Sequence, residues 1–212
     1  MDIKFKYFLF DWDGCLVNTL PIWFSGMREG LSYFNIDAPD NTIKKGFQGW
    51  DIFSKLGVYD MDIFTNQVYK YVENNLCNVR FNEGVIETLI QLNKKEIKSA
   101  IVTSTEKEKV YSVLERLNSI DLFDSVIGRN DVKKQKPDCE AIDKALKAIN
   151  GDKFLSAIVG DSEVDIQSGQ NARISTIWFS SNKNKDYHIH INERELKPNF
   201  TITSFHELQR FF

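Results

Sequence analysis

Phe8-Leu9-Phe10-Asp11-Trp12-Asp13-Gly14-Cys15-Leu16-Val17 joins an apolar run to two carboxylates and a glycine. The apolar run is typical of a buried strand, and Asp and Gly are typical of the turn that follows one. Two carboxylates one residue apart repel each other, and at the edge of a core they also lose hydration. Such a pair is favoured where a cation, a proton or chemistry compensates its charge, although turn formation alone would also explain these residue types.

Three further polar clusters lie beside apolar or helical segments. Thr103-Ser104 follows an apolar run, Lys133-Lys134-Gln135-Lys136-Pro137 precedes a predicted helix, and Asp161-Ser162-Glu163-Val164-Asp165 follows a second apolar run. An acid pair, a hydroxyl, a lysine and a second acid pair are groups that phosphoryl transfer uses to hold and neutralise a phosphate. Together the four clusters favour a site for a phosphorylated substrate.

Apolar runs and helical periodicities alternate along most of the chain. Strands are predicted near residues 7–10, 97–102, 125–128, 155–159 and 175–178, and helices at 85–94, 107–117, 140–149 and 163–171. A closing strand and a short helix are predicted at 199–208. The alternation predicts an α/β fold with a doubly wound, Rossmann-like parallel sheet, in which clusters at the carboxyl ends of strands converge.

The alternation stops between residues 18 and 84, which are predicted to be mostly helical with loops near 35–42 and 46–50. Apolar residues at helical spacing predict a small bundle there. We therefore expect a Rossmann-like catalytic core formed by residues 1–17 and 85–212, with a small α-helical cap inserted at 18–84. An ordinary helical lobe without a role in substrate choice is the alternative.

The four clusters, with room for an insertion after the first, resemble the motifs of the haloacid dehalogenase superfamily, in the branch of phosphoglycolate phosphatase and β-phosphoglucomutase. The resemblance covers nearly the whole chain. It implies a helical cap that closes over the nucleophile and contributes specificity residues from its loops. The candidate loop is residues 46–50, with Gln48 and Trp50 as substrate contacts. A turn that packs an aromatic side chain is the alternative.

Two of the acids have expected chemical roles. Asp11 is the expected nucleophile, because a carboxylate at a strand end can attack phosphorus and form an aspartyl-phosphate. Asp13 is the expected acid and base, which protonates the leaving alcohol and then deprotonates water. The resemblance also favours phosphoryl transfer over carbon–halogen cleavage, because dehalogenating members of the family lack the second acid.

The phosphate is expected to contact the turn at Gly14, the hydroxyl of Thr103 and the backbone amide of Ser104 at the start of the next helix. Lys136, which matches the third motif of the family, would neutralise the charges of the phosphoryl group and the nucleophile. Helix capping by Thr103 and a solvated surface position for the lysine are the alternatives.

Hard oxygen ligands suit Mg²⁺, and the second acid pair supplies them. Asp161 is the expected direct ligand. The resemblance implies that it acts with Asp11 and the backbone carbonyl of Asp13, while Asp165 supports the site through water or Lys136. Capping of the following helix by Asp and Ser is the alternative.

The chain has 212 residues, of which 42% are hydrophobic, and a formal net charge of −3. This length suits one globular unit with a small second lobe. Lysines interspersed with acids argue against a nucleic-acid partner, and short apolar segments argue against a membrane partner, so a cytoplasmic protein is expected. The cysteines and histidines lack the spacing of a metal or disulfide site: Cys15, Cys77, Cys139, His188, His190 and His206. Cys15 is expected to pack in its turn.

The sequence thus predicts a Mg²⁺-dependent phosphohydrolase that cleaves a small soluble phosphate monoester, as a monomer or a small homo-oligomer. A sugar-phosphate mutase of the β-phosphoglucomutase type stays open, because such relatives share all four core motifs. A receiver-like signalling domain or a non-catalytic phosphate-binding protein is a distant alternative. Receivers place the phosphorylated Asp on a middle strand and lack a helical insertion, which fits this chain poorly.

Overall fold

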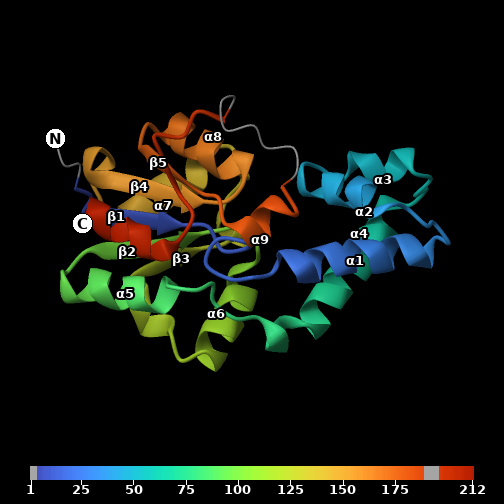
Figure 1. The fold of residues 1–212 in the computed structure, drawn as a ribbon, viewed down its shortest axis with the longest axis horizontal. Coiled ribbons are helices and arrows are strands. Elements are labelled where there is room, and N and C mark those ends of the chain that lie inside the picture. The colour runs from blue at the N-terminus through green and yellow to red at the C-terminus, as the bar shows by residue number, and fades with distance from the viewer. Residues whose placement is uncertain (1–3, 189–195) are drawn as a thin grey trace. The chain divides into compact units, whose positions relative to one another are not determined.

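The computed structural model describes residues 4–188 and 196–212. The chain forms two compact units (Figure 1). The first contains the described residues of Met1–Asn18, Arg80–Asn182 and Ile191–Phe212, and the second contains those of Thr19–Val79 and Lys183–His190. In the described residues, no helix has both the length and the apolar character needed to cross a membrane.

A six-stranded sheet with the order β3-β2-β1-β4-β5-β6 forms the centre of the first unit. Its strands are β1 Tyr7–Phe10, β2 Lys98–Val102, β3 Ser125–Ile127, β4 Ser156–Gly160, β5 Ser175–Phe179 and β6 Phe200–Ile202. Every pair of neighbouring strands in this sheet is parallel. The chain runs outward from β1 to β3 on one side and from β4 to β6 on the other, so the strand order reverses between β1 and β4. The predicted doubly wound α/β fold is confirmed.

Four longer helices accompany the sheet: α5 Val85–Lys94, α6 Lys107–Arg116, α7 Glu140–Ala148 and α8 Glu163–Ala172. α7 and α8 contact each other and the strands, whereas α5 contacts β2 and the terminal 3₁₀ helix η6 Phe205–Phe211 (Figure 1). The apolar positions of α7 pack with Leu9, Val102 and Ile158 of the strands. Shorter 3₁₀ turns lie between these elements: η3 Ile120–Leu122, η4 Arg129–Asp131 and η5 Lys153–Leu155.

The five strands and four helices predicted for the first unit agree with the structure to within one residue at each end. The closing strand is shorter than predicted, because β6 ends at Ile202. The backbone amides of Thr203 and Ser204 donate to Glu207 Oε1 at 2.8 and 3.1 Å, so these two residues cap η6 rather than extend the strand.

The second unit is a helical bundle formed by α1 Leu20–Tyr33, α2 Asp40–Ile43, η1 Lys44–Phe47, α3 Asp51–Lys55, α4 Met61–Asn74 and η2 Leu76–Asn78. α1 packs against α4 around a buried apolar cluster that includes Phe53, Phe64 and Val68. A Cβ atom at Gly30 would lie 2.8 Å from the Phe64 ring, so this glycine permits the close approach of the two helices.

Both loops predicted in this region are shorter than expected. The first loop, predicted at 35–42, ends earlier than predicted, because α2 begins at Asp40 directly after Pro39. Asp40 also forms an ion pair with Arg28. The second loop, predicted at 46–50, begins later than predicted, because η1 continues to Phe47. Gly46 is buried there, and a Cβ atom would lie 2.5 Å from Met27 Sδ, so this glycine serves packing.

Residues 183–188 follow β5 in the sequence but belong to the second unit. They include most of the short helix α9 Asn182–Lys185. The Tyr187 ring lies 5.9 Å from the Phe24 ring and 5.6 Å from the Phe47 ring, measured between centroids. Lys44 Nζ lies 5.8 Å from the centroid of Tyr187. Aromatic contacts therefore attach this later segment to the bundle. His190 lies outside the described residues.

Candidate active site

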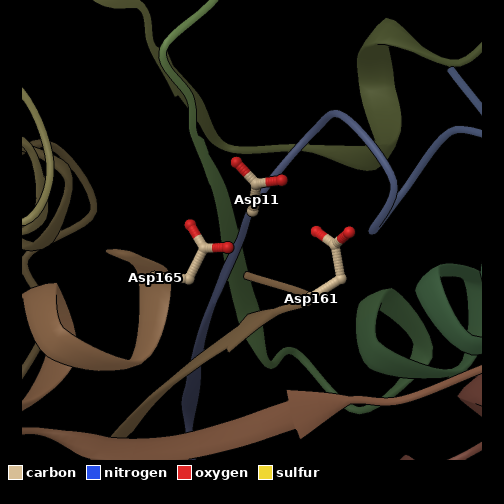
Figure 2. A group of neighbouring side chains, drawn as sticks. All are labelled: Asp11, Asp161 and Asp165. Atoms are coloured by element: carbon tan, nitrogen blue, oxygen red, sulfur yellow. The ribbon is translucent and has the colours of Figure 1, made fainter. Parts of the chain in front are cut away.

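The carboxyl ends of the central strands bring the acidic residues together. Phe10, the last residue of β1, is paired with Ile101 of β2 and Val159 of β4, so Asp11 follows directly at the ends of both neighbours. Asp161 follows β4, and Asp165 lies in the first turn of α8. Figure 2 shows these three side chains gathered at the point where the strand order reverses, which is where ligands bind in doubly wound sheets.

Lys136 completes this cluster from the segment before α7. Its Nζ atom lies 2.5 Å from Asp11 Oδ1, 2.5 Å from Asp165 Oδ1 and 3.3 Å from the Val102 carbonyl oxygen. The Lys136 side chain is 4% exposed and that of Asp165 is 1% exposed. The surface alternative for this lysine is therefore wrong. Lys133 and Lys134 are exposed, so the structure distinguishes Lys136 from its neighbours.

Burial and charge shift the pKa values in this cluster. Burial, followed by the charge of Asp165, raises the pKa of Asp11 well above 3.8, and the opposing effect of Lys136 does not cancel this. Burial alone would lower the pKa of Lys136, but the charges of Asp11 and Asp165 raise it above 10.5. The neighbouring carboxylates therefore favour the ammonium form of Lys136, whereas burial disfavours the ionised form of Asp11, an effect that a further cation would offset.

The donor set fits a divalent metal ion. Asp11, Asp161 and Asp165 each offer a carboxylate oxygen, and these oxygens lie within 4.8 Å of one another. Three carboxylates against one ammonium leave an excess of two negative charges in a buried site, which a divalent cation would neutralise. Oxygen-only donors suit Mg²⁺. The Asp13 side chain is not part of this group.

Asp165 is held by the protein through both of its oxygens. Oδ1 contacts Lys136, whereas Oδ2 accepts hydrogen bonds from Ser162 Oγ at 2.5 Å and from the Ser162 amide at 3.1 Å. A Cβ atom at Gly160 would lie 2.3 Å from Asp165 Cβ, so only glycine leaves room for it. Asp165 therefore caps α8, in agreement with the helix-capping alternative drawn from the sequence, and it also contacts Lys136.

Asp13 lies in the turn after β1, where Gly14 has a φ of +82°. Asn82 Nδ2 donates to the carbonyl oxygens of Gly14 at 3.1 Å and Cys15 at 2.7 Å, which fixes the turn. The Thr105 hydroxyl donates to Asp13 Oδ2 at 2.6 Å. Thr105 and Asn82 were not singled out from the sequence, because neither belongs to a recognisable motif.

Thr103 follows β2 and is 4% exposed. Its Oγ1 atom accepts a hydrogen bond from the Thr105 amide at 3.0 Å. Ser104 lies in the turn that follows, and α6 begins only at Lys107, so the expectation that Ser104 starts the helix is wrong. The polar residues between Thr103 and Lys107 form a loop stabilised by side-chain hydrogen bonds instead.

Cys15 is buried, and its thiol donates to the Val159 carbonyl oxygen at 3.4 Å. Burial, followed by the charge of Asp11, raises the pKa of this thiol well above 9.0. The thiol therefore stays protonated and packs, as predicted.

The two predicted substrate contacts of the cap loop lie in the second unit. Gln48 is exposed, and Trp50 is half-buried with its ring centroid 5.7 Å from that of Phe64. Trp50 therefore packs within its own unit. Contact of either residue with a substrate stays a prediction.

Residues 8–179 match the haloacid dehalogenase-like hydrolase family. Pyrophosphatase PpaX from Halalkalibacterium halodurans is 29% identical over 211 residues, which cover 94% of this chain and 93% of the relative. PpaX from Bacillus mycoides is 30% identical over 191 residues, covering 84% and 85%.

Solved structures agree in fold. A crystal structure of a candidate phosphoglycolate phosphatase from Lactobacillus plantarum has a TM-score of 0.84 at 21% identity, covering 99% of this chain and all of the other. A crystal structure of a protein from Haemophilus somnus that is described as a predicted phosphoglycolate phosphatase has a TM-score of 0.81 at 25% identity, covering 97% of each chain. These findings confirm the predicted resemblance and the prediction of a phosphatase-type enzyme. The chain belongs to the haloacid dehalogenase-like hydrolase family.

Proposed function

We propose that this protein is a Mg²⁺-dependent phosphatase that hydrolyses a small soluble phosphate monoester through a phosphorylated Asp11. The observation that carries the proposal is the contact of Asp11 with Lys136 beside Asp161, at the switch point of the sheet. A second acid two residues later, Asp13, supplies the group that hydrolysis of an alkyl ester needs.

In the first step, an Asp11 carboxylate oxygen attacks phosphorus and the bond from phosphorus to the ester oxygen breaks. Asp13 gives its proton to the departing alkoxide, which leaves as an alcohol. In the second step, Asp13 takes a proton from water as that water attacks phosphorus, and the bond to Asp11 breaks to release phosphate. Proton transfer of this kind contributes about 10²- to 10⁴-fold to the rate.

Lys136 would neutralise charge on the nucleophile and on the transferred phosphoryl group. The Thr103 hydroxyl, the Ser104 amide and the turn at Gly14 would hold the phosphate oxygens. Asp11, Asp161 and the backbone carbonyl of Asp13 would hold Mg²⁺, which supplies further neutralisation of the phosphoryl charge when bound. Asp165 would act by holding Lys136, which is supported by the engagement of both its oxygens.

Two substrates are the first to be tested. Phosphoglycolate is supported by the branch of the family that the sequence resembles. Inorganic pyrophosphate, which is a phosphoric anhydride and not a monoester, is the second candidate, because relatives at 29% and 30% identity are named pyrophosphatase PpaX. A mutase is not proposed, because no contact in the described residues favours return of the phosphoryl group to a sugar. The cytoplasmic location, the monomeric or small homo-oligomeric state and a small-molecule partner stay predictions.

The test is hydrolysis of p-nitrophenyl phosphate, phosphoglycolate and pyrophosphate with Mg²⁺ by the wild type and by Asp11→Asn. Glu115→Gln is the matched control, because Glu115 is an exposed carboxylate on α6. We expect wild-type activity that Asp11→Asn abolishes and Glu115→Gln retains. A wild type inactive on all three substrates, or an equally active Asp11→Asn, would contradict the proposal.

A further inference from the structure

We infer that Thr105 is a positioning residue for Asp13. It holds this acid in a fixed position relative to Thr103, whose hydroxyl is proposed to bind phosphate. The inference rests on the proposed function, because it assigns Asp13 the role of acid and base. Thr105 itself is not placed in contact with the reacting atoms.

The contact joins residues that are distant in the sequence. Thr105 Oγ1 donates to Asp13 Oδ2 at 2.6 Å across a separation of 92 residues. A hydrogen bond from a hydroxyl to a carboxylate is short and strong when the acceptor is ionised. One carboxylate oxygen of Asp13 is therefore held in a fixed direction, and this sets the rotation of the whole group.

The backbone of Thr105 is fixed on both sides by groups other than Asp13. Its amide donates to Thr103 Oγ1 at 3.0 Å, and its carbonyl oxygen accepts from the Arg129 amide at 2.9 Å. The β-branched side chain has few rotamers, so a fixed backbone also fixes the hydroxyl. Thr105 can hold Asp13 because it does not depend on Asp13 for its own position.

The same residue contacts two parts of the proposed site. The Thr105 amide donates a hydrogen bond to Thr103 Oγ1, and the Thr103 hydroxyl would bind phosphate. The Thr105 hydroxyl donates to Asp13, which would protonate the leaving group. Thr105 thus sets the relative position of the acid and the phosphate-binding hydroxyl. Small misplacements of such groups reduce rates strongly, because proton transfer requires hydrogen-bond distance to the leaving oxygen.

The test compares Thr105→Val, which keeps the β-branched shape without the hydroxyl, with Thr105→Ser, which keeps the hydroxyl. Two esters are used: p-nitrophenyl phosphate, whose phenolate leaves without protonation, and a simple alkyl phosphate such as glycerol phosphate, whose alkoxide requires it. We expect Thr105→Val to lower kcat/KM for the alkyl ester by roughly 10- to 100-fold, and for the aryl ester by less than about threefold. Thr105→Ser should stay within about threefold of the wild type on both esters, because it keeps the donor.

A second readout separates the two steps of the reaction. Because Asp13 also acts as base in the hydrolysis of the phosphorylated enzyme, Thr105→Val should release a burst of p-nitrophenolate before a slower steady rate. In an Asp13→Asn background, Thr105→Val should cause little further decrease in kcat/KM for the alkyl ester, since the effects of two residues that act as a unit are not additive. If Thr105→Val does not fold, as judged by circular dichroism, Thr105→Ala takes its place.

Equal losses on both esters, or no rescue by Thr105→Ser, would overturn the inference, since either would indicate a merely structural role. The same assay includes the wild type and Asp11→Asn. If the wild type is active, Asp11→Asn is inactive and Thr105→Val equals the wild type, the inference alone fails. A wild type without activity on these two esters and on phosphoglycolate and pyrophosphate overturns the proposed function and this inference with it.

Discussion

Lys136 Nζ lies 2.5 Å from Asp165 Oδ1, and this contact links the segment before α7 to the first turn of α8. The other oxygen of Asp165 accepts two hydrogen bonds from Ser162. These contacts support the proposed role of Asp165 in holding the lysine, whereas Asp161, which follows β4, is the proposed direct metal ligand.

Asp161→Asn and Asp165→Asn should differ in their effect on Mg²⁺ binding measured by calorimetry. Loss of a direct ligand should weaken binding beyond about 100-fold, whereas loss of a supporting partner should weaken it by about tenfold. Asp165→Asn should also lower kcat, because Lys136 loses one of its two carboxylate partners. Stronger loss of Mg²⁺ binding in Asp165→Asn than in Asp161→Asn would reverse the two roles.

Lys136→Met should destabilise the metal-free protein at neutral pH by about 3–5 kcal/mol, because it leaves buried carboxylates without their cation. Urea unfolding in the presence of EDTA measures this, and added Mg²⁺ should recover part of the loss. Lys134→Met is the matched control, since the Lys134 side chain is 74% exposed. Its effect should stay within about 0.5 kcal/mol. Equal effects of the two changes would show that Lys136 is not the essential cation of the cluster.

Gly160→Ala should reduce activity strongly, because the added Cβ would lie 2.3 Å from Asp165 Cβ. Both atoms are attached directly to the backbone, so α8 or β4 must shift and Asp165 must move relative to Lys136. We expect destabilisation of about 1–3 kcal/mol by urea unfolding, together with a fall in kcat. Wild-type kcat in a folded Gly160→Ala protein would show that the position of Asp165 is not critical.

Glu140 should contribute a pH-dependent term to stability. A hydrogen bond from Lys144, followed by those from the amides of Lys133 and Lys134, lowers the pKa of Glu140 from 4.5 to about 2. Its stabilising effect is therefore present above pH 4.5 and is lost as the pH falls toward 2.

Glu140→Gln tests this prediction by thermal unfolding between pH 2 and pH 6. The difference in Tm between wild type and variant should be constant above about pH 4.5 and should shrink as the pH falls toward the lowered pKa. Amide exchange at Lys133 and Lys134 should also rise in the variant, because their acceptor is weakened. A Tm difference that does not change with pH would contradict the lowered pKa.

Gly30→Ala should destabilise the helical unit, because its Cβ would lie 2.8 Å from the buried Phe64 ring. Forcing the ring to move in a packed core costs about 1–3 kcal/mol. Gly49→Ala is the control, since only Asp51 Oδ1, at 3.1 Å, lies near its Cβ position. Urea unfolding followed by tryptophan fluorescence compares the two. A larger decrease in the free energy of unfolding for Gly49→Ala than for Gly30→Ala would show that packing at Gly30, between α1 and α4, is not the tighter of the two sites.

Strands and helices of the first unit could be inferred from the sequence because their signals are local. The apolar run before Asp11 and the periodic apolar positions of α7 each lie within one segment. The order of the motifs also indicated the family, which the match of residues 8–179 confirms. The extent of the second unit was less accessible, since the Tyr187 contacts join it to a segment more than 100 residues later.

The residue types and order of the candidate site were therefore available from the amino-acid sequence: acids after β1 and β4, a hydroxyl after β2 and a lysine before α7. Which side chains meet depended on packing. The contacts of Lys136 with Asp11 and Asp165 and the contact of Thr105 with Asp13 all arise from distances between separate segments. Local periodicity specifies where a strand ends, but only the parallel sheet and its covering helices bring those ends within hydrogen-bond distance.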